Sequence, residues 1–456
     1  MPVNIFGVLV GLAISIILII RKLNPVTSMF LGTIIGALVG GASLYQKLAY
    51  IIIPGGHSVI GIIVRIIAGG VLAGVLIESG AAESIARGII DRLGEKRALL
   101  ALALSSMILL AVGIFLPVSV VILAPIALSV AHKAKVSKFA AILALSGGAK
   151  AGNIISPNPN TISAAEAFGL PLGDVMIGGF VPALCALIAT MVLVNLVKNK
   201  GFQVKDTDLE KNDDSGTAAG SSTPEGSTGL PAHIRAKVNG AASAASELPP
   251  FSKAIIAPLT AIVLLILRPI GTIFNIGFLE SLDLDAFIVL PIGAVTGALV
   301  MGKRRNILDY VNKGITRMAP VVLMLLGAGA LTGLITNSVL PEMIITAMEK
   351  LGVPALFLAP VSGIIMGAAT GSAATGVIVA GSSFAGTLLA QGVPALSAAV
   401  MIHAGAALFD VVPHGNYFLA GQDSMKVSMT ERMKVIPYEA LIGTVMTIAA
   451  VVINSI

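Results

Sequence analysis

The residues best suited to chemistry are polar side chains that interrupt a long apolar run. From Ser146 to Phe168 the chain reads SGGAKAGNIISPNPNTISAAEAF, a stretch long enough to cross a membrane. A lysine ammonium can hold a carboxylate through a charge-assisted hydrogen bond, and amide and hydroxyl groups can hold the rest of a small anion. The ligands that this stretch predicts are Lys150, Asn153, Ser156, Asn158, Asn160 and Thr161.

A second apolar run is interrupted at 410–417, where the chain reads DVVPHGNY. Asp410 is a candidate for coupling to a proton or to sodium. His414 is a second candidate for the proton, because the ordinary pKa of histidine is about 6.5. Asn416 is a further candidate ligand. Structural roles remain alternatives: Lys150 could pair with Asp410 or Glu166, and His414 could cap a helix.

The composition indicates the surroundings of these residues. Hydrophobic residues make up 56% of the chain and charged residues 11%, with a mean hydropathy of +0.97. A soluble domain has about a quarter charged residues, and apolar runs of spanning length, about 20 residues, recur throughout. The chain is therefore predicted to be a polytopic membrane protein. Its positive residues lie at loop ends, which argues against a nucleic-acid partner, and a single cysteine excludes an internal disulfide.

The prolines predict breaks in two helices at membrane depth. Pro157 and Pro159 remove backbone donors and disfavour helix before each, and Pro413 with Gly415 provides the same signal in the second run. Unwound backbone inside a membrane is tolerated only where it is buried in protein or lines a watery cavity. The polar residues of both runs are therefore expected to line such a cavity.

The chain divides into two halves of matching pattern. GGVLAGVLIESG (69–80) matches AGALTGLITNSV (328–339), and at a nearly constant offset Asn153 aligns with Asp410. Between the halves lies a segment rich in Ser, Gly and charge, which cannot bury enough apolar surface to fold alone. We predict a transmembrane repeat over 1–200, a flexible hydrophilic cytoplasmic linker over 201–252, and a second transmembrane repeat over 253–456.

Charge predicts that the second repeat is inverted. The basic loops of the first half, such as DRLGEKR (91–97), are placed in the cytoplasm by the positive-inside rule. The equivalent loops of the second half hold only Lys350, which places them outside. The predicted re-entrant hairpins, 98–131 and 353–390, then enter from opposite faces.

The tips of these hairpins are the other candidate parts of the site. The first lies near VGIFLPVSVV (112–121), and the second is the small-residue run GAATGSAATG (367–376). Helix N-termini at such tips would present N–H groups to an anion. Packing of small residues between helices is the alternative. The candidate ligands at the tips are Ser119, Thr370, Gly371, Ser372 and Thr375.

The run GGVLAGVLIESGAAESIARGIIDRLGEKRALLALAL and the later ISPNPNTISAAEAFGLPLGDVMIGGFVPAL resemble the gluconate permease family of the ion transporter superfamily. The resemblance implies proton-coupled symport of sugar acids such as gluconate, with some members moving other small hydroxy or amino acids. It also implies inverted repeats, re-entrant hairpins, broken helices and an elevator-like motion. In this sequence, the resemblance places the hairpin tips at 113–119 and 370–376 and the helix breaks at 153–161 and 410–416. The turns SPNPNT and FLPVS depart from the sugar-acid members, which leaves a different organic acid open.

Together these observations predict an all-α polytopic membrane protein with two inverted repeats, each with a re-entrant hairpin and a broken transmembrane helix. The predicted function is import of a small organic anion, gluconate or a related sugar or hydroxy acid, in symport with protons across the plasma (inner) membrane. No cofactor or metal is expected, and a homodimer is open because elevator transporters are often dimers. The alternatives are a sodium-coupled dicarboxylate or amino-acid transporter, an intramembrane enzyme, for which no motif is present, and a passive channel, which broken helices and opposed hairpins fit poorly.

Overall fold

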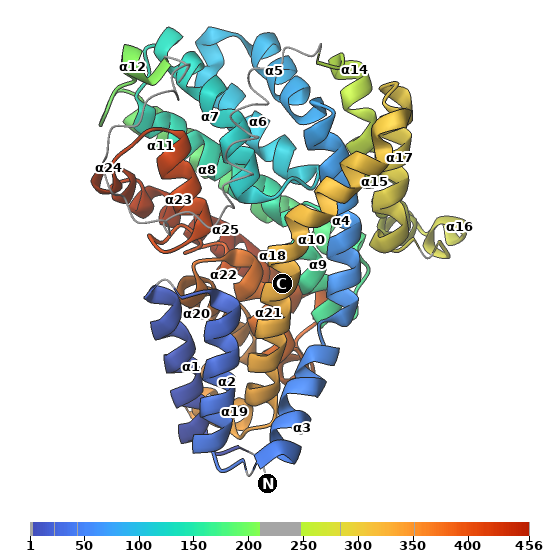
Figure 1. Ribbon diagram of the computed structural model, residues 1–456, viewed down its shortest axis with the longest axis vertical. Coiled ribbons are helices and arrows are strands. Elements are labelled where there is room, and N and C mark those ends of the chain that lie inside the picture. Colours follow the sequence, from blue (N-terminus) through green and yellow to red (C-terminus); the bar gives the residue numbers. More distant parts are fainter. Residues whose placement is uncertain are drawn as a thin grey trace.

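The computed structural model describes residues 3–21, 23–42, 44–209, 248–282, 284–350 and 352–455. Over these residues the chain is α-helical, with short 3-10 turns and no β-strand (Figure 1). Eight of the helices in this part of the chain are long and apolar enough to cross a membrane. The predicted class of all-α polytopic membrane protein is therefore confirmed.

The first half holds twelve helices among its described residues. They are α1 (Ile5–Ile20), α2 (Pro25–Val39), α3 (Leu44–His57), α4 (Ile60–Glu78), α5 (Ala81–Leu93), α6 (Ala98–Ala111), α7 (Leu116–Lys133), α8 (Lys138–Ile154), α9 (Pro159–Ala167), α10 (Leu172–Gly178), α11 (Phe180–Val197) and α12 (Asp206–Leu209).

The second half begins after the part of the linker that is not described. Its helices are α14 (Phe251–Ala254), α15 (Ile256–Phe274), α16 (Gly277–Glu280), α17 (Ala286–Val300), α18 (Ile307–Thr336), α19 (Leu340–Lys350), α20 (Leu358–Thr370), α21 (Ala373–Ala390), α22 (Ala395–Ala406), α23 (Asn416–Ser424), α24 (Met429–Met433) and α25 (Ile436–Asn454).

Helix α3, like the short helices α5 and α12, is an element of the first half that the sequence patterns do not predict. The run LYQKLAYIIIPGGH is short, and a proline and two glycines end its apolar part. In Figure 1, α3 and α4 follow one another along the same side of the molecule.

The two halves repeat the same order of elements from α4 to α11 and from α18 to α25. Each order contains a long helix, a short helix, a hairpin, a broken helix and a closing helix. Figure 1 shows α5, α6 and α7 toward one end of the molecule and α19, α20 and α21 toward the other. This order agrees with the predicted repeats, while their inversion stays a prediction.

The halves also interlock through their hairpins. The second helix of the first hairpin, α7, packs against α23 of the second half. The second helix of the other hairpin, α21, packs against α9 of the first half. Each hairpin therefore reaches the outer part of the other half's broken helix, and both tips come to the same place.

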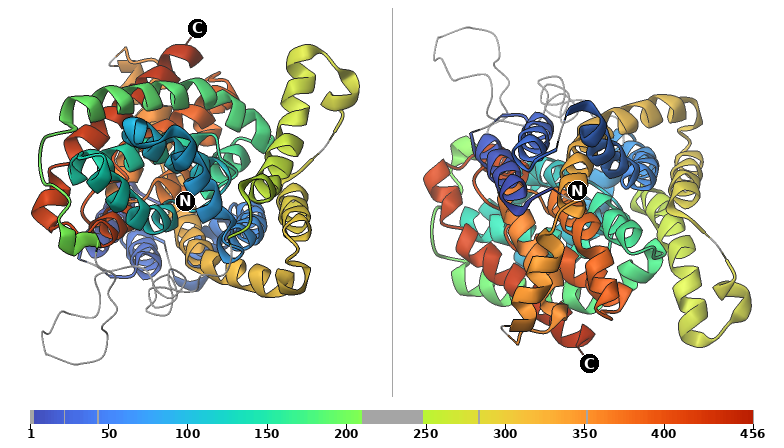
Figure 2. Two further views of the ribbon diagram at one scale, coloured as in Figure 1. Left: turned by 90° about the horizontal axis from the view of Figure 1, so that it is seen from above. Right: turned by 90° about the horizontal axis from the view of Figure 1, so that it is seen from below.

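Close packing of small residues holds the frame around these hairpins. Helices α4 and α18 cross where Gly70 and Gly74 face Gly314, and a Cβ added to Gly314 would lie 2.1 Å from the Gly70 carbonyl oxygen. Small residues at such crossings let the backbones of membrane helices approach closely. Helices α15, α16 and α17 extend from one side of the body (Figure 2).

The outer and inner helices differ in which side chains they bury. Helix α11 exposes apolar side chains at helical spacing, namely Phe180, Leu184, Ile188 and Val192, as expected for a face against lipid. Every residue of α8 is buried, including Lys150 and Asn153. The polar residues of α8 are therefore in the interior of the protein and not in contact with lipid.

Ion pairs join α4 to the elements around it. Arg65 of α4 pairs with Glu166 at the end of α9 and with Asp285 before α17, the latter at 2.6 Å. Near the other end of α4, Glu78 pairs with Arg317 and, at 3.1 Å, with Lys313, both on α18. Helix α4 is thus the common partner of α9, α17 and α18.

The first residues of the predicted linker lie against the transmembrane body. Phe202 packs edge-on against Phe139 with ring centroids 5.7 Å apart, and Asp208 pairs with Lys138 at 2.8 Å. Burial would raise the pKa of Asp208, but the hydrogen bonds from Lys138 and from the Lys205 backbone outweigh burial and lower it. Residues 210–247 lie outside the described part of the chain, so the division into three domains stays a prediction.

Candidate functional site

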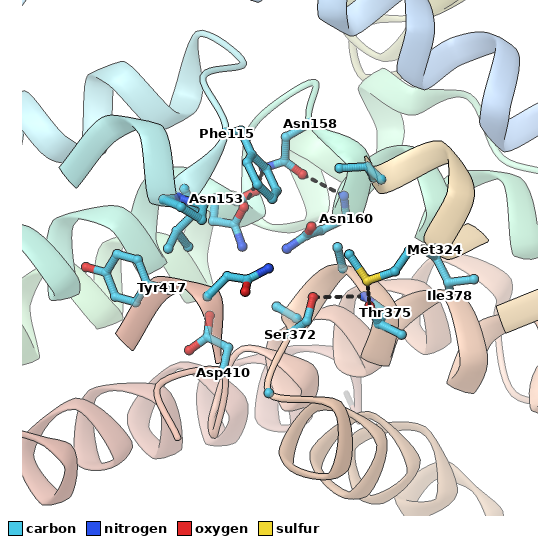
Figure 3. A pocket seen from close by; sticks show the side chains of 17 residues that line it. Phe115, Asn153, Asn158, Asn160, Met324, Ser372, Thr375, Ile378, Asp410 and Tyr417 are labelled. Atoms are coloured by element: carbon cyan, nitrogen blue, oxygen red, sulfur yellow. Dashed lines mark hydrogen bonds between the residues drawn. The ribbon is translucent and has the colours of Figure 1, made fainter. Parts of the chain in front are cut away.

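Both helix breaks and both hairpin tips meet around one cavity. The first break separates α8 from α9, and the second separates α22 from α23. The tips are the turns that join α6 to α7 and α20 to α21. The polar residues that line the cavity are Asn153, Asn158, Asn160, Ser372, Thr375, Asp410, Asn416 and Tyr417, with Gly371 at the second tip (Figure 3). Eight of the predicted site residues therefore lie at one place.

Asn158 builds the first break by using all of its hydrogen-bonding groups. Its Oδ1 accepts from the backbone N–H groups of Asn160 (2.8 Å) and Thr161 (3.2 Å), which caps α9. Its Nδ2 donates to the carbonyl oxygen (2.8 Å) and to Oδ1 (2.5 Å) of Asn153. These hydrogen bonds satisfy backbone groups that would otherwise be buried without partners, and they hold the unwound residues in a fixed conformation.

Asn153 is left with an open donor. Its side chain is buried, and its Nδ2 has no hydrogen-bond partner among the described residues. Figure 3 shows Asn153 and Asn160 on one side of the cavity, with Ser372 and Thr375 across from them. An unpaired buried donor is costly, so a ligand with an acceptor oxygen would stabilise this side of the cavity.

Four helices begin at the cavity. Phe115 precedes α7, Asn158 precedes α9, Ser372 precedes α21 and Gly415 precedes α23. The first residues of each of these helices line the cavity. The N-terminus of a helix carries a partial positive charge and free N–H groups, so four of them together favour an anion.

The second tip needs a glycine. Gly371 has a φ of +62°, a left-handed conformation that side chains disfavour. A Cβ at this position would also lie 2.9 Å from the Cα of Gly415. The Ser372 side chain then caps α21 by accepting from the Thr375 N–H at 3.3 Å.

Lys150 and Asp410 form a buried ion pair. The Lys150 Nζ lies 2.5 Å from Asp410 Oδ1, and the two side chains are 1% and 4% exposed. The ammonium also donates to the carbonyl oxygen of Ala407, which follows α22. Asp410 lines the cavity and Lys150 lies behind it. The pairing with Asp410 is one of the alternatives that the sequence leaves open.

The other predicted ligands hold the backbone near the cavity and do not line it. Ser156 donates to the Leu110 carbonyl, and Thr161 to that of Asn153 at 3.3 Å. Ser119 donates to the Leu116 carbonyl at 2.8 Å, and Thr370 to that of Met366 at 2.8 Å. These hydroxyls therefore fix the ends of the helices that surround the cavity.

His414 lies against the second tip. A Cβ added to Gly371 would lie 2.8 Å from Cδ2 of its ring. Its Nε2 has no hydrogen-bond partner in the part of the chain that the structure describes. His414 thus contacts a tip residue that lines the cavity without lining the cavity itself.

The sequence patterns do not single out most of the apolar residues that line the cavity. These residues belong to the first tip, α7, α18 and α21. They are Phe115, Leu116, Pro117, Val321, Met324, Ala373, Ala374 and Ile378. Phe115 to Pro117 fall inside the predicted tip, whereas on α18 the only local signal is Pro320, which precedes Val321.

No group of three or more His, Cys, Asp or Glu side chains in the described part of the chain is arranged to hold a metal ion. The fold and the cavity instead define a class of protein. Hairpins and broken helices that meet around a buried polar cavity are typical of secondary transporters.

The comparisons with known proteins identify the family. The model of the GntP family permease matches residues 3–456, and the chain belongs to this family. It is a family of transporters, not of enzymes. A protein of Haemophilus influenzae named an uncharacterized transporter is 44% identical over 451 residues, which cover 99% of this chain and 98% of the relative.

Two more distant relatives carry a substrate in their names. The high-affinity gluconate transporter of Escherichia coli is 22% identical over 72% of this chain and 69% of its own. The gluconate permease of Bacillus subtilis is 24% identical over 79% of each chain. Among solved structures, the YdaH transporter of Alcanivorax borkumensis superposes with a TM-score of 0.55 at 14% identity, covering 97% of both chains. That likeness supports the fold.

Proposed function

We propose that this protein is a secondary active transporter of the plasma (inner) membrane that imports a small organic anion together with protons. The observation that carries the proposal is the convergence of four helix N-termini on a cavity whose wall contains Asp410, itself paired with Lys150. The names of the two gluconate-transporting relatives support an organic acid as cargo.

The anion would be held mainly by backbone and amide groups. The first residues of α7, α9, α21 and α23 line the cavity, and Asn153 offers an open donor. The caps at Asn158 and Ser372 fix the starts of α9 and α21 and use N–H groups of Asn160, Thr161 and Thr375, so the anion would receive the N–H groups that remain. A carboxylate placed among them would receive charge-assisted hydrogen bonds, which are stronger than neutral ones.

The charges of Lys150 and Asp410 support proton coupling. Without cargo, Lys150 and Asp410 together have no net charge, so an anion would bring an uncompensated negative charge into a buried cavity. Protonation of Asp410 leaves the Lys150 ammonium as the net charge, and an anion then restores neutrality. Proton and anion would therefore bind more favourably together than separately, which is positive cooperativity and a negative coupling free energy.

The arrangement also supports the proposed motion. Residues of both hairpin tips line the cavity, and each hairpin contacts the broken helix of the other half. In inverted repeats of this kind the site is exposed alternately to the two sides as one part moves against the other. We therefore include the inverted repeats and an elevator-like motion in the proposal.

Uptake by purified protein in proteoliposomes tests this function. The expected result is accumulation of a labelled organic acid that depends on an inward proton gradient and is indifferent to sodium. Asp410→Asn should abolish accumulation while exchange of internal for external substrate continues. The matched control is Asp91→Asn, an exposed carboxylate on α5, which should behave as wild type. Uptake that needs sodium and ignores the pH gradient would instead support the alternative coupling ion.

A further inference from the structure

Arg65 of α4 connects α17 with α9. Its Nε and Nη2 donate to the Asp285 carboxylate at 2.6 to 3.2 Å, and its Nη1 donates to Glu166. Asp285 also caps α17 by accepting from the Phe287 N–H at 2.8 Å. Glu166 lies in the last turn of α9. One edge of the guanidinium is therefore held at the start of α17, and its remaining nitrogen reaches α9.

The two partners of Arg65 belong to parts that the proposed motion would separate. Helices α17 and α18 both pack against α4, and we call these three helices the frame. Helix α9 begins at the cavity, where Asn158 ties it to Asn153 of α8, and it packs against α21 and α22. We call the hairpins and broken helices, α6 to α9 and α20 to α23, the carrier part. The bond between Arg65 and Glu166 thus crosses from the frame to the carrier part, whereas the pairs of Glu78 with α18 stay within the frame.

The bond to Glu166 can open without leaving a buried charge. The side chains of Arg65, Glu166 and Asp285 are 29%, 31% and 34% exposed, so water can solvate Glu166 when it leaves, while Arg65 keeps Asp285 as its counter-charge. Gly61 permits the close approach, because a Cβ there would lie 2.0 Å from Glu166 Oε1. A partly exposed ion pair adds little to overall stability. It is nevertheless enough to change the ratio of two conformations that are close in free energy.

The matching position of the second half carries an uncharged residue. The alignment of 69–80 with 328–339 places Arg65 over Met324, whose Sδ accepts from the Thr375 hydroxyl at 3.2 Å. In inverted repeats, the two halves would exchange their roles between the two end states of the transport cycle. An ion pair that depends on Arg65 would therefore form in one end state and not in its counterpart.

Building on the function proposed above, we propose that Arg65 and Glu166 form a state-dependent ion pair that holds the carrier part against the frame. The pair stabilises the end state that the structure describes, and it opens before the cavity reaches the other side of the membrane. Asp285 keeps Arg65 in place while Glu166 moves away with α9. The pair thus sets the ratio of the two end states without contacting the cargo.

Single-molecule fluorescence energy transfer measures this ratio. Dyes are attached to cysteines that replace the exposed Lys133 of the carrier part and the exposed Arg305, just before α18 of the frame, with Cys185 replaced by serine. A disulfide between cysteines at Gly69 and Ile162 marks the signal of the described state, because a Cβ at Gly69 would lie 4.0 Å from Ile162 Cδ1.

Two variants open the pair in different ways. Glu166→Gln removes the charge, and Gly61→Ala keeps every charge but displaces the Glu166 carboxylate from α4. Each should lower the ratio of the described state to its counterpart by about three- to five-fold. Two matched controls should keep the wild-type ratio: Glu83→Gln breaks an ion pair within α5, and Gly56→Ala adds a Cβ that meets nothing within 4 Å.

The outcomes separate this inference from the proposed function. If Glu166→Gln and Gly61→Ala fold and keep the wild-type ratio, the inference is wrong, and uptake of an organic anion by the wild-type protein still decides the proposed function. An equal shift in Glu83→Gln would also overturn the inference, because the effect would not depend on a bond between frame and carrier part. A wild-type protein with a single distance and no uptake of any organic anion would overturn both.

Discussion

The buried pair of Lys150 and Asp410 gives the sharpest test of the structure. The two charged groups lie 2.5 Å apart in the interior, and the Lys150 ammonium also donates a hydrogen bond to the Ala407 carbonyl oxygen. Helix α8 and the break after α22 are thus joined by one side chain. Removing that side chain changes both stability and the charge of the cavity.

The size of the effect follows from which charge is left behind. Lys150→Met removes the cation and leaves a buried carboxylate, for which we expect a loss of about 3–5 kcal/mol in the free energy of unfolding. Asp410→Asn keeps an oxygen that can accept from the ammonium, but it leaves Lys150 without a counter-charge, so its cost should be similar or smaller. The double variant removes both charges. Since replacing a complete buried pair is often neutral, it should recover at least half of the loss.

The assay is unfolding of the purified protein in mixed micelles, followed by circular dichroism, for wild type, both single variants and the double variant. Lys96→Met, at an exposed lysine next to α5, is the control and should lie within about 0.5 kcal/mol of wild type. The double variant should be folded yet lack proton-driven accumulation. If Lys150→Met is as stable as wild type, or if the two single effects simply add, the two side chains do not form the pair and the charge argument for symport is refuted.

Three further predictions concern the frame of the site. Cysteines introduced at Glu95 and Gln391 should react with impermeant reagents from opposite sides of the membrane. Labelling of both from the same side would contradict the predicted inversion of the repeats. Gly371→Ala should lower anion affinity by about 1–2 kcal/mol in binding assays, because its φ of +62° is unfavourable for alanine; an unchanged affinity would show that the tip can rearrange. Arg65→Met should cost less than about 2 kcal/mol in unfolding, because Arg65 pairs with carboxylates that are partly exposed. A loss larger than that of Lys150→Met would show that this network is buried in the membrane.

The parts of the site that depend on backbone chemistry could be predicted from the sequence. Pro157 and Pro159 cannot continue a helix, and the structure breaks α8 from α9 just there. The small residues around Gly371 form the second tip, as their pattern predicts. In both places the signal is local, because a missing donor or a missing side chain restricts the chain wherever it lies.

The partners of the charged residues could not be predicted in the same way. Lys150 had two carboxylates as candidates, and the choice of Asp410 depends on how α8 packs against the end of α22. Glu166, the other candidate, pairs with Arg65 of α4. Such choices depend on tertiary contacts between residues far apart in the chain, for which a single sequence holds no local signal.

The apolar residues of the cavity could not be predicted for a related reason. Met324 and Val321 belong to a long apolar helix, in which residues that face a cavity are of the same types as residues that face lipid. Only the three-dimensional structure shows that Met324 lines the cavity while its neighbour Leu323 is exposed. Sequence patterns in a membrane protein therefore reveal the polar part of a site more readily than its apolar part.

The two halves bring different side chains to matching positions, and this difference bears on how binding and coupling can be separated. The alignment places Asn153 over Asp410, and both line the cavity. Asn153 does not change its charge with pH, so the proton would not alter its ability to donate to an anion. In the proposed mechanism Asp410 changes its charge, and its partner Lys150 comes from the same helix as Asn153. Protonation of Asp410 in the second half would then leave the positive charge of Lys150 uncompensated in the first half, on the helix that also carries the open donor of Asn153.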